Sequence, residues 1–387
     1  MDTTNETNAE MKSPTLQQLK ACQFSSWYPT FRSLNSSSNE YSYPLNNVTI
    51  RSITISPLPS NFIEYLKSDG VVLPKGAEKV SSFLPSSDVT NDDDGWSSEE
   101  EDKTDDTEEG NPPSEEIYFP ALNQEIQNAL DTLGPCMPKL NWSAPKDVTW
   151  LNESTLKCGT IGDVYLLLKS SDFCMFDLEH AMDDITMDDG DHPLEYELVM
   201  RKWSNLHASM EFRCFVSNHE LVGICQRNYT QHYPHLKREY MEIRAHIVDF
   251  YDTYIDENYA GGTVEDYVFD VYVDKDDRVW LIDFNLWSVR TDALMFKWDE
   301  LVKLADTQDA EIDRANEDES EDVITIENAR PEIRVVMNEN EVHYDPLASY
   351  RAPIDTVDLA SDQAGSKTFQ DFMAMCAKPS DIDNESE

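Results

Sequence analysis

Alternating apolar and polar residues in the second half of the chain predict two antiparallel hairpins. Residues 211–216 and 221–226 are strand-like runs separated by four polar residues, and residues 267–273 and 279–284 are separated by five. Runs rich in β-branched and aromatic residues on either side of a polar turn are typical of paired strands. We therefore expect a hairpin in each place.

The rest of the chain mixes helical spacing with further strand-like runs. Ser13 followed by Pro14 is a typical helix start, and aromatic residues then recur at helical spacing from Phe24 to Phe31, which predicts a face packed against the body. The pattern predicts helices over 61–67, 121–133, 161–168, 238–257 and 298–304, and strands over 47–55, 137–140 and 196–200. Helices mixed with antiparallel hairpins indicate an α+β fold.

The net charge of −46 over 387 residues is concentrated in two segments. Residues 91–117 contain thirteen acidic residues and one lysine, and residues 305–387 contain twenty-two acidic and six basic residues. The first segment buries too little apolar surface to offset chain entropy, so we expect a disordered insertion. A surface of this charge repels nucleic-acid backbones and attracts basic protein surfaces.

These signals divide the chain into six stretches. They are a disordered N-terminus at 1–13, a body segment at 14–90, the acidic insertion at 91–117, a dense core at 118–304, an acidic segment returning to the body at 305–362, and a tail at 363–387. A flexible insertion within a domain is tolerated because loop-closure entropy grows slowly with length.

Cysteine usage and the absence of long apolar runs indicate the compartment. The seven cysteines are scattered without a Cys-x-x-Cys pair, which is typical of reduced thiols in the cytoplasm. The first ten residues are polar, so no secretory signal is visible. No apolar run approaches the roughly 20 residues that cross a bilayer. We expect a soluble cytoplasmic protein, monomeric outside its complexes.

The second hairpin brings carboxylates together. Centring its turn on residue 276 places Asp270 opposite Asp283, and the period of two puts Asn285 on the same face. The same register pairs Tyr272 with Leu281 and Val268 with Asn285. The other face is uniformly apolar and should face the core; it consists of Phe269, Val271, Val273, Trp280, Ile282 and Phe284.

The repulsion between opposed carboxylates must be offset, because like charges directly across a sheet are destabilising. A shared proton or a bound cation would reduce this repulsion. Magnesium prefers oxygen ligands and usually takes one or two carboxylates together with substrate phosphates. The pattern therefore favours a metal held by Asp270, Asp283 and Asn285, with an exposed hairpin whose acids only face water as the alternative.

Basic residues within predicted strands are candidates for binding a phosphate beside such a metal. A lysine offers phosphate a point charge, whereas an arginine can bind it through two hydrogen bonds. The sequence contains no Gly-x-x-x-x-Gly-Lys loop, which argues against a P-loop enzyme. The candidates are Lys139, Arg201, Lys202, Arg213 and Arg227, with Trp142 or Trp203 available to contact a base.

Several of these segments resemble the cell-division-cycle protein 123 family. The similar runs occur in order over about residues 20 to 360 and contain rare residues in fixed context. They are Cys22-Gln23-Phe24-Ser25-Ser26-Trp27-Tyr28-Pro29, Pro138-Lys139-Leu140-Asn141-Trp142-Ser143-Ala144-Pro145, Lys169-Ser170-Ser171-Asp172, Arg201-Lys202-Trp203, Glu211-Phe212-Arg213-Cys214-Phe215-Val216, Trp280-Leu281-Ile282-Asp283-Phe284-Asn285 and Ser349-Tyr350-Arg351-Ala352-Pro353.

The resemblance implies an ATP-grasp-like fold, with two lobes of mixed and antiparallel sheets around a cleft that binds Mg-ATP. It also implies a chaperone that contacts the gamma subunit of eukaryotic translation initiation factor 2, promotes assembly of that factor, and so supports translation initiation and cell-cycle progression. Within a nucleotide- and metal-binding core at 118–304, it implies nucleotide contacts from Lys139, Asn141, Trp142, Arg201, Lys202, Trp203, Arg213 and Arg227, and magnesium ligands at Asp270, Asp283 and Asn285.

The chain departs from the family pattern directly after Asn285. The family has Pro, an aromatic residue and Gly there, whereas Leu286, Trp287 and Ser288 stand in this chain. The acidic insertion is also longer than the family needs. The candidate metal ligands themselves are intact.

Two other functions are open at this point. The same fold can host a ligase that activates a carboxylate as an acyl phosphate, and the acidic segments alone fit a nucleotide-free chaperone for basic proteins. The eight histidines are scattered and none lies in the candidate pocket motifs, so the sequence shows no nucleophile–base pair. We therefore expect a binding module rather than a turnover enzyme.

Overall fold

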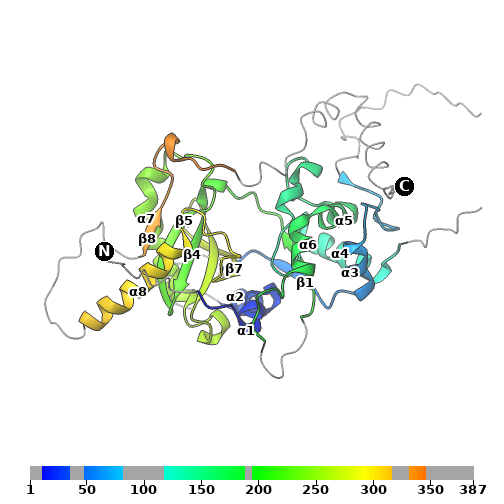
Figure 1. Ribbon diagram of the computed structural model, residues 1–387. Helices are drawn as coiled ribbons and strands as arrows, with labels where there is room; N and C mark the ends of the chain where they lie inside the picture. Colours follow the sequence, from blue (N-terminus) through cyan, green and yellow to red (C-terminus); the bar gives the residue numbers. More distant parts are fainter. Residues whose placement is uncertain (1–10, 35–47, 82–116, 188–193, 316–330, 346–387) are drawn as a thin grey trace, which may run out of the picture. The chain divides into compact units, whose positions relative to one another are not determined.

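The computed structural model describes residues 11–34, 48–81, 117–187, 194–315 and 331–345 (Figure 1). Apart from residues 11–13 and 117, the predicted disordered N-terminus, acidic insertion and tail lie outside them. The chain divides into two compact units. One takes Met1–Leu58, Lys139–Ala144 and Phe176–Ser349, and the other takes Pro59–Pro138, Pro145–Met175 and Tyr350–Glu387.

The first unit is built around a five-stranded sheet of order β7-β6-β4-β5-β8. Both predicted hairpins are confirmed, since β4 pairs antiparallel with β5 and β6 with β7. The sequence pattern missed β8, which lies in the predicted acidic segment and pairs parallel to β5. The strands are β4 (Glu211–Ser217), β5 (Glu220–Gln226), β6 (Tyr267–Val273), β7 (Val279–Leu286) and β8 (Glu332–Arg334).

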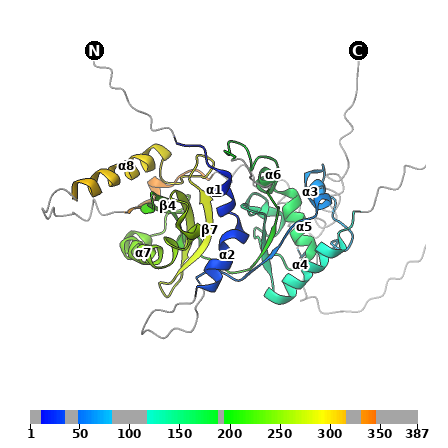
Figure 2. The same ribbon diagram turned by 90° about the horizontal axis from the view of Figure 1, so that it is seen from below.

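The helices of this unit include two N-terminal ones that lie beside β7 in Figure 2. The predicted helix at 238–257 begins slightly earlier and ends in a π-helical turn. The described helices and helical turns are α1 (Leu16–Ala21), α2 (Phe24–Ser33), η3 (Ala208–Met210), α7 (Leu236–Phe250), η4 (Tyr251–Ile255), η5 (Tyr259–Gly262), α8 (Trp298–Ala315) and η7 (Glu339–Glu341).

Two apolar cores lie on opposite faces of the five-stranded sheet. Phe269 and Phe284 belong to the core that includes α2 and α7, whereas Val268 belongs to a smaller core with Leu301 of α8. Side chains alternate along a strand, so neighbours such as Val268 and Phe269 serve different cores. The sheet is therefore covered on both sides.

The aromatic face of α2 is packed against the body, as the sequence predicts. Phe24, Trp27 and Phe31 are at most 2% exposed. The rings of Trp27 and Phe31 each lie 5.5 Å from that of Phe284 in β7, centroid to centroid. Pro29 is accommodated within the helix. This packing fixes α2 beside the strand that carries Asp283.

A smaller sheet has the order β1-β3-β2. β1 (Ser52–Ile55) pairs antiparallel with β3 (Leu198–Lys202). The boundary between the two units runs through β2 (Cys136–Lys139), between Pro138 and Lys139, and through α6 (Asp172–Glu179). The α+β class is confirmed, because helices are present together with sheets built mainly from antiparallel strand pairs.

The second unit packs helices around Tyr165, which is fully buried. The Tyr165 ring lies 5.6 Å from that of Phe62. A capping box at Thr160 begins α5, the helix predicted at 161–168, and Gly134, at φ 77°, ends α4. The helices and helical turns are α3 (Ser60–Lys67), α4 (Pro120–Leu133), η2 (Lys146–Leu151) and α5 (Ile161–Ser170).

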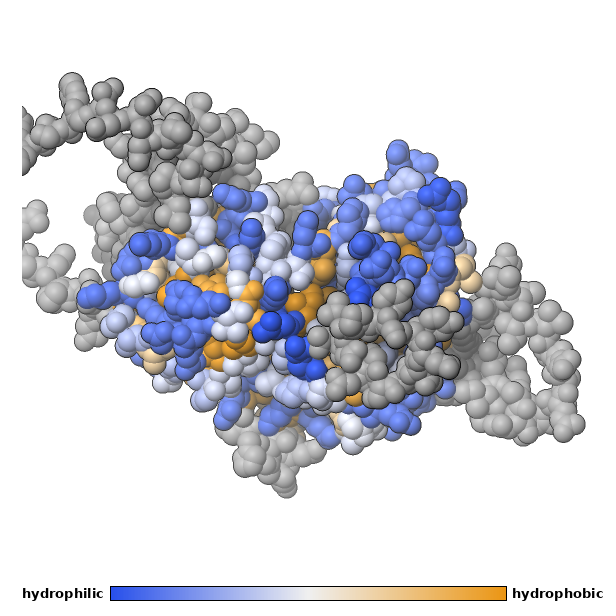
Figure 3. Space-filling model, turned by 180° about the vertical axis from the view of Figure 1, so that it is seen from behind, coloured by the Kyte–Doolittle hydropathy of each residue, from blue (hydrophilic) through white to orange (hydrophobic). Residues whose placement is uncertain are grey.

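Hydrophilic side chains cover most of the face visible in Figure 3, and apolar ones show between them. Over the described part of the chain, no helix is both long enough and apolar enough to pass through a bilayer.

Lys169, the first residue of one of the runs that resemble the family, has a structural role. Its ammonium group donates to the carbonyl oxygens of Tyr65 (2.6 Å), Leu66 (3.1 Å) and Ser68 at the end of α3. The last carbonyls of a helix lack helical partners and carry partial negative charge, so a cation there is stabilising. Burial lowers the pKa of Lys169, and the nearby Asp69 opposes that change.

Replacing Lys169 with Met should lower the free energy of unfolding by about 2–3 kcal/mol, because several buried carbonyls lose a charged donor. Urea unfolding followed by circular dichroism measures this. The control is Lys67→Met, since Lys67 is an exposed lysine of α3, the helix whose end Lys169 contacts; it should change stability by less than about 0.5 kcal/mol. Equal effects of the two changes would contradict the helix-end role.

Candidate functional site

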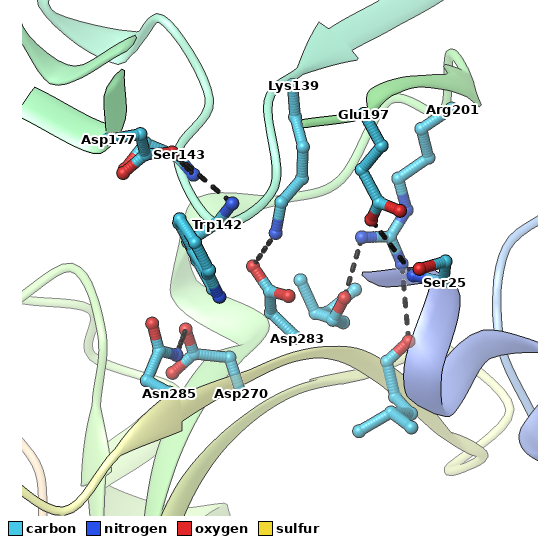
Figure 4. A network of polar contacts seen from close by, with 12 residues as sticks. Ser25, Lys139, Trp142, Ser143, Asp177, Glu197, Arg201, Asp270, Asp283 and Asn285 are labelled. Carbon is cyan, nitrogen blue, oxygen red and sulfur yellow. Dashed lines mark hydrogen bonds and ion pairs between the residues drawn. The ribbon is translucent and has the colours of Figure 1, made fainter. Parts of the chain in front are cut away.

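The β6–β7 hairpin places Asp270 directly opposite Asp283, as the sequence predicts. It also pairs Val268 with Asn285 in the predicted register. Figure 4 shows Asp270 and Asn285 side by side on this hairpin, with Asp283 close to them. The two carboxylates and the amide therefore do converge on one face.

Beyond the aspartates the predicted register is wrong. A β-bulge interrupts the pairing, so Tyr272 pairs with Trp280, and Leu281 pairs with Val271. An extra residue in one strand reverses the faces that follow it. Leu281 is consequently fully buried, whereas Trp280 and Ile282, predicted to be core residues, are only partly buried.

Arginines, rather than a shared proton, neutralise Asp270. Arg213 from β4 donates through Nε to Oδ1 (2.8 Å) and through a terminal nitrogen to Oδ2 (2.9 Å). The Nε of Arg227 lies 3.2 Å from the same Oδ2, and the Asn285 amide donates to it at 3.4 Å. Asp270 is 2% exposed and the Arg213 side chain 7%. Arg213 and Asp270 therefore form a buried, bidentate ion pair within one sheet.

Arg227 extends the cluster toward solvent. Its side chain is 23% exposed, and a terminal nitrogen donates to Glu211 Oε2 at 3.1 Å. Burial alone would lower the pKa of Arg227, but the carboxylates of Asp270, Glu211 and Asp283 together raise it above its usual value. Arg227 therefore stays charged at any pH at which the protein is folded.

Asp283 is partnered on one oxygen only. The ammonium group of Lys139, at the end of β2, donates to Oδ2. Among the described residues, the buried Oδ1 atom has no hydrogen-bond partner. The side chains of Lys139 and Asp283 are 2% and 17% exposed. A buried carboxylate oxygen without a donor is costly in a folded protein, so this atom marks a position suited to a cation.

Arg201 supports the strand on which Asp283 lies. It donates to the carbonyls of Ile282 (2.7 Å) and Leu281 (3.3 Å), which directly precede Asp283. Burial lowers the pKa of Arg201, and Asp283 is foremost among the groups that oppose this. Figure 4 shows Arg201 reaching these carbonyls from β3. Its guanidinium thus fixes the backbone of the site.

The loop after Lys139 contains two more predicted site residues. Asn141 is fully buried; its amide donates to the carbonyl of Glu195 (2.8 Å) and accepts from the N–H of Glu197 (3.0 Å). The indole N–H of Trp142 donates to the Leu19 carbonyl at 3.2 Å. In these contacts Asn141 anchors the loop to the backbone before β3.

Among the described residues, no hydrogen bond, ion pair or ring contact joins the side chains of Lys202 and Trp203 to this cluster. Lys202 is exposed at the end of β3, and Trp203 directly after it is half-buried. Their predicted nucleotide contacts remain predictions.

A cavity of about 160 Å³ lies beside the cluster, within the first unit. Trp142, Asn285 and Leu286 form part of its wall, together with Asp177 and Arg290. Burial raises the pKa of Asp177 to about 6, although donors from Ser143 and Trp142 and the charge of Lys139 act in the other direction.

Sequence reasoning missed both charged residues of this wall. The signal for Asp177 is a single carboxylate within the apolar run 173–178. Arg290 follows β7 and donates to the carbonyls of His180 (2.8 Å), Ala181 (3.0 Å) and Asp183 (3.0 Å). Sequence spacing alone gives no indication of contacts across so many residues.

The three residues that depart from the family pattern after Asn285 are well packed. Leu286 is 9% exposed, and the Trp287 ring lies edge-on to that of Trp298, 5.1 Å between centroids. The buried Ser288 accepts through its carbonyl from the N–H of Thr291 at 2.9 Å. The chain therefore forms a closed turn beside the candidate ligands without the Pro and Gly.

The family model described as D123 matches residues 42–360 of the chain. The chain belongs to the D123 family. This confirms the family predicted from the sequence runs, and it agrees with a 34% identical relative from Phaeosphaeria nodorum called cell division cycle protein 123, over 80% of this chain and 86% of that one.

Several relatives are similar to this chain over nearly their whole length. The translation initiation factor eIF2 assembly protein of Xenopus tropicalis is 37% identical over 371 residues, which cover 95% of this chain and 99% of that one. The protein of the same name from Danio rerio is 38% identical, with 93% and 94% covered. The solved structure of Cdc123 from Schizosaccharomyces pombe is 32% identical, with a TM-score of 0.56, over 84% of this chain and 98% of that one.

Replacing Asp270 with Ala should lower the free energy of unfolding by about 3–5 kcal/mol, because Arg213 and Arg227 would be left close together without their shared carboxylate. Chemical denaturation measures the effect. Glu211→Ala removes the more exposed carboxylate of the same Arg227, and it should cost about 1 kcal/mol or less. If both variants lost the same stability, the buried pair would not be the main anchor.

Proposed function

We propose that this chain binds Mg-ATP at the acid–base cluster of Lys139, Arg213, Arg227, Asp270 and Asp283, in an ATP-grasp-like fold. The observation that carries the proposal is the Lys139–Asp283 pair, in which a buried ammonium group is balanced by a carboxylate whose second oxygen has no partner among the described residues. Such a pair offers one group to a phosphate and one to a cation.

The residues present fit a magnesium ion. One oxygen of Asp283 has no hydrogen-bond partner among the described residues. The Asn285 amide nitrogen donates to Asp270, which leaves the amide oxygen of Asn285 as its ligand atom. Asp270, the third predicted ligand, is already neutralised by Arg213 and would have to share its oxygens. Hard oxygen donors of this kind are what magnesium prefers, and a bound magnesium would neutralise phosphate charge.

The bases of the cluster suit a polyphosphate. Lys139 provides a point charge, and Arg213 and Arg227 provide planar donors. Asp283, Asp270 and Glu211 balance the charges of these groups. A phosphate and its metal would bind together. The phosphate would attract the basic side chains away from the carboxylates, and the positive charge of the metal would take their place.

We further propose that the chain promotes assembly of eukaryotic translation initiation factor 2 in the cytoplasm, through contact with the gamma subunit. The support is that relatives similar over more than nine-tenths of this chain are called eIF2 assembly proteins. The strongly acidic chain suits a basic partner surface. Nucleotide binding then serves to stabilise the form that holds the partner.

Isothermal titration calorimetry should show ATP binding that requires magnesium. Lys139→Ala and Asp283→Asn should each weaken it at least about tenfold, because each removes a charged contact. The matched controls are Lys275→Ala and Asp276→Asn in the turn of the β6–β7 hairpin, where the side chains are 90% and 59% exposed. Both variants should bind ATP like the unchanged protein. Absence of binding by the unchanged protein would overturn the nucleotide proposal.

In a pull-down, the chain should retain the isolated gamma subunit of the factor and neither of the other subunits alone. Asp283→Asn should impair assembly of the three subunits, whereas deletion of residues 91–116 should spare it. The reverse pattern would favour the nucleotide-free acidic chaperone. Turnover of ATP with a defined carboxylate and amine would instead indicate a ligase.

A further inference from the structure

The loop that follows Lys139 is closed and held from its two sides. The N–H of Leu140 donates to the carbonyl of Ser143 at 3.0 Å, which closes the turn. On one side, the buried Asn141 amide fixes the loop to Glu195 and Glu197. A loop held in this way has little freedom to change the position of the lysine before it.

On the other side, the loop is held by Asp177 of α6. Its Oδ2 accepts from the backbone N–H groups of Ser143 (2.7 Å) and Trp142 (3.3 Å), and its Oδ1 accepts from the Ser143 hydroxyl at 2.8 Å (Figure 4). Asp177 is 4% exposed. Burying a carboxylate is costly, so three donors from one turn indicate that this turn must be held.

The held loop also forms a wall of the cavity of about 160 Å³, which Trp142 and Asn285 both line. The loop therefore joins two parts of the candidate site. One is Lys139 with its carboxylate partner Asp283, and the other is the cavity lined by the side chain of Asn285 in β7. A displacement of the loop would change both at once.

We propose that Asp177 is a positioning residue for the Mg-ATP site: it holds the 140–143 loop so that Lys139 and Trp142 keep their places before nucleotide arrives. This rests on the proposed function. Asp177 acts through hydrogen bonds to the loop and does not touch the nucleotide. Preorganised loops improve affinity because less ordering is needed on binding.

A comparison of two substitutions separates holding the loop from supplying charge. In Asp177→Asn the amide oxygen still accepts from both backbone N–H groups, and the amide nitrogen can donate to the Ser143 hydroxyl. Asp177→Ala removes every one of these contacts. If Asp177 acts by position, Asn retains function and Ala loses it; if it acts by charge, both variants lose function.

The experiment measures magnesium–ATP affinity by calorimetry and, separately, amide hydrogen exchange over residues 140–144 without nucleotide. Asp177→Ala should bind about tenfold more weakly and exchange faster in this segment, while Asp177→Asn stays within about twofold of the unchanged protein. Asp163→Ala is the matched control. Asp163 is fully buried and accepts from Gly159 and Thr160 in the turn before α5 and from the more distant Ser81.

Each outcome has a defined meaning. Unchanged exchange and affinity in Asp177→Ala, equal loss in Asp177→Asn, or equal loss of affinity in Asp163→Ala would overturn the positioning role. If the unchanged protein bound no ATP, the proposed function would fail. The exchange measurement would still decide whether Asp177 holds the loop, and circular dichroism confirms that each variant is folded.

Discussion

The charge balance of one sheet face is the constraint on which the candidate site depends. Asp270 and Asp283 are opposed across two strands, so their repulsion destabilises the hairpin unless positive charge offsets it. Arg213 of the neighbouring strand, Arg227 and Lys139 supply it. The order of the sheet is therefore part of the electrostatics, because β4 must lie next to β6 for Arg213 to reach Asp270.

The remaining structure keeps this arrangement in place. The aromatic rings of α2 pack on Phe284, the residue after Asp283. Arg201 holds the two carbonyls before it. Asp283 is thus fixed from both sides along its strand while one of its oxygens has no partner in the described structure. A rigid backbone around an unsatisfied atom is what a prepared ligand site requires.

Much of this could be predicted because the signals are local. Alternation in two short runs indicated both hairpins and the Asp270–Asp283 register, and apolar spacing indicated the helix that ends at Leu133 and the helix that begins at Ile161. The bulge after Asp270 could not be predicted, since nothing in the run marks an extra residue. The pairing of Arg213 with Asp270 and the place of Asp177 depend on contacts between distant segments, for which sequence spacing gives no direct measure.

The path of the chain has a practical consequence. The stretch from Lys139 to Ala144 belongs to the first unit, although the residues on both sides of it belong to the second. A contiguous fragment that contains one whole unit therefore carries parts of the other as well. Truncation is the usual means of assigning a function to a region, but a truncation from the N-terminus that passes residue 58 removes parts of both units. Regions of this chain are better separated by point substitutions than by deletion of long segments.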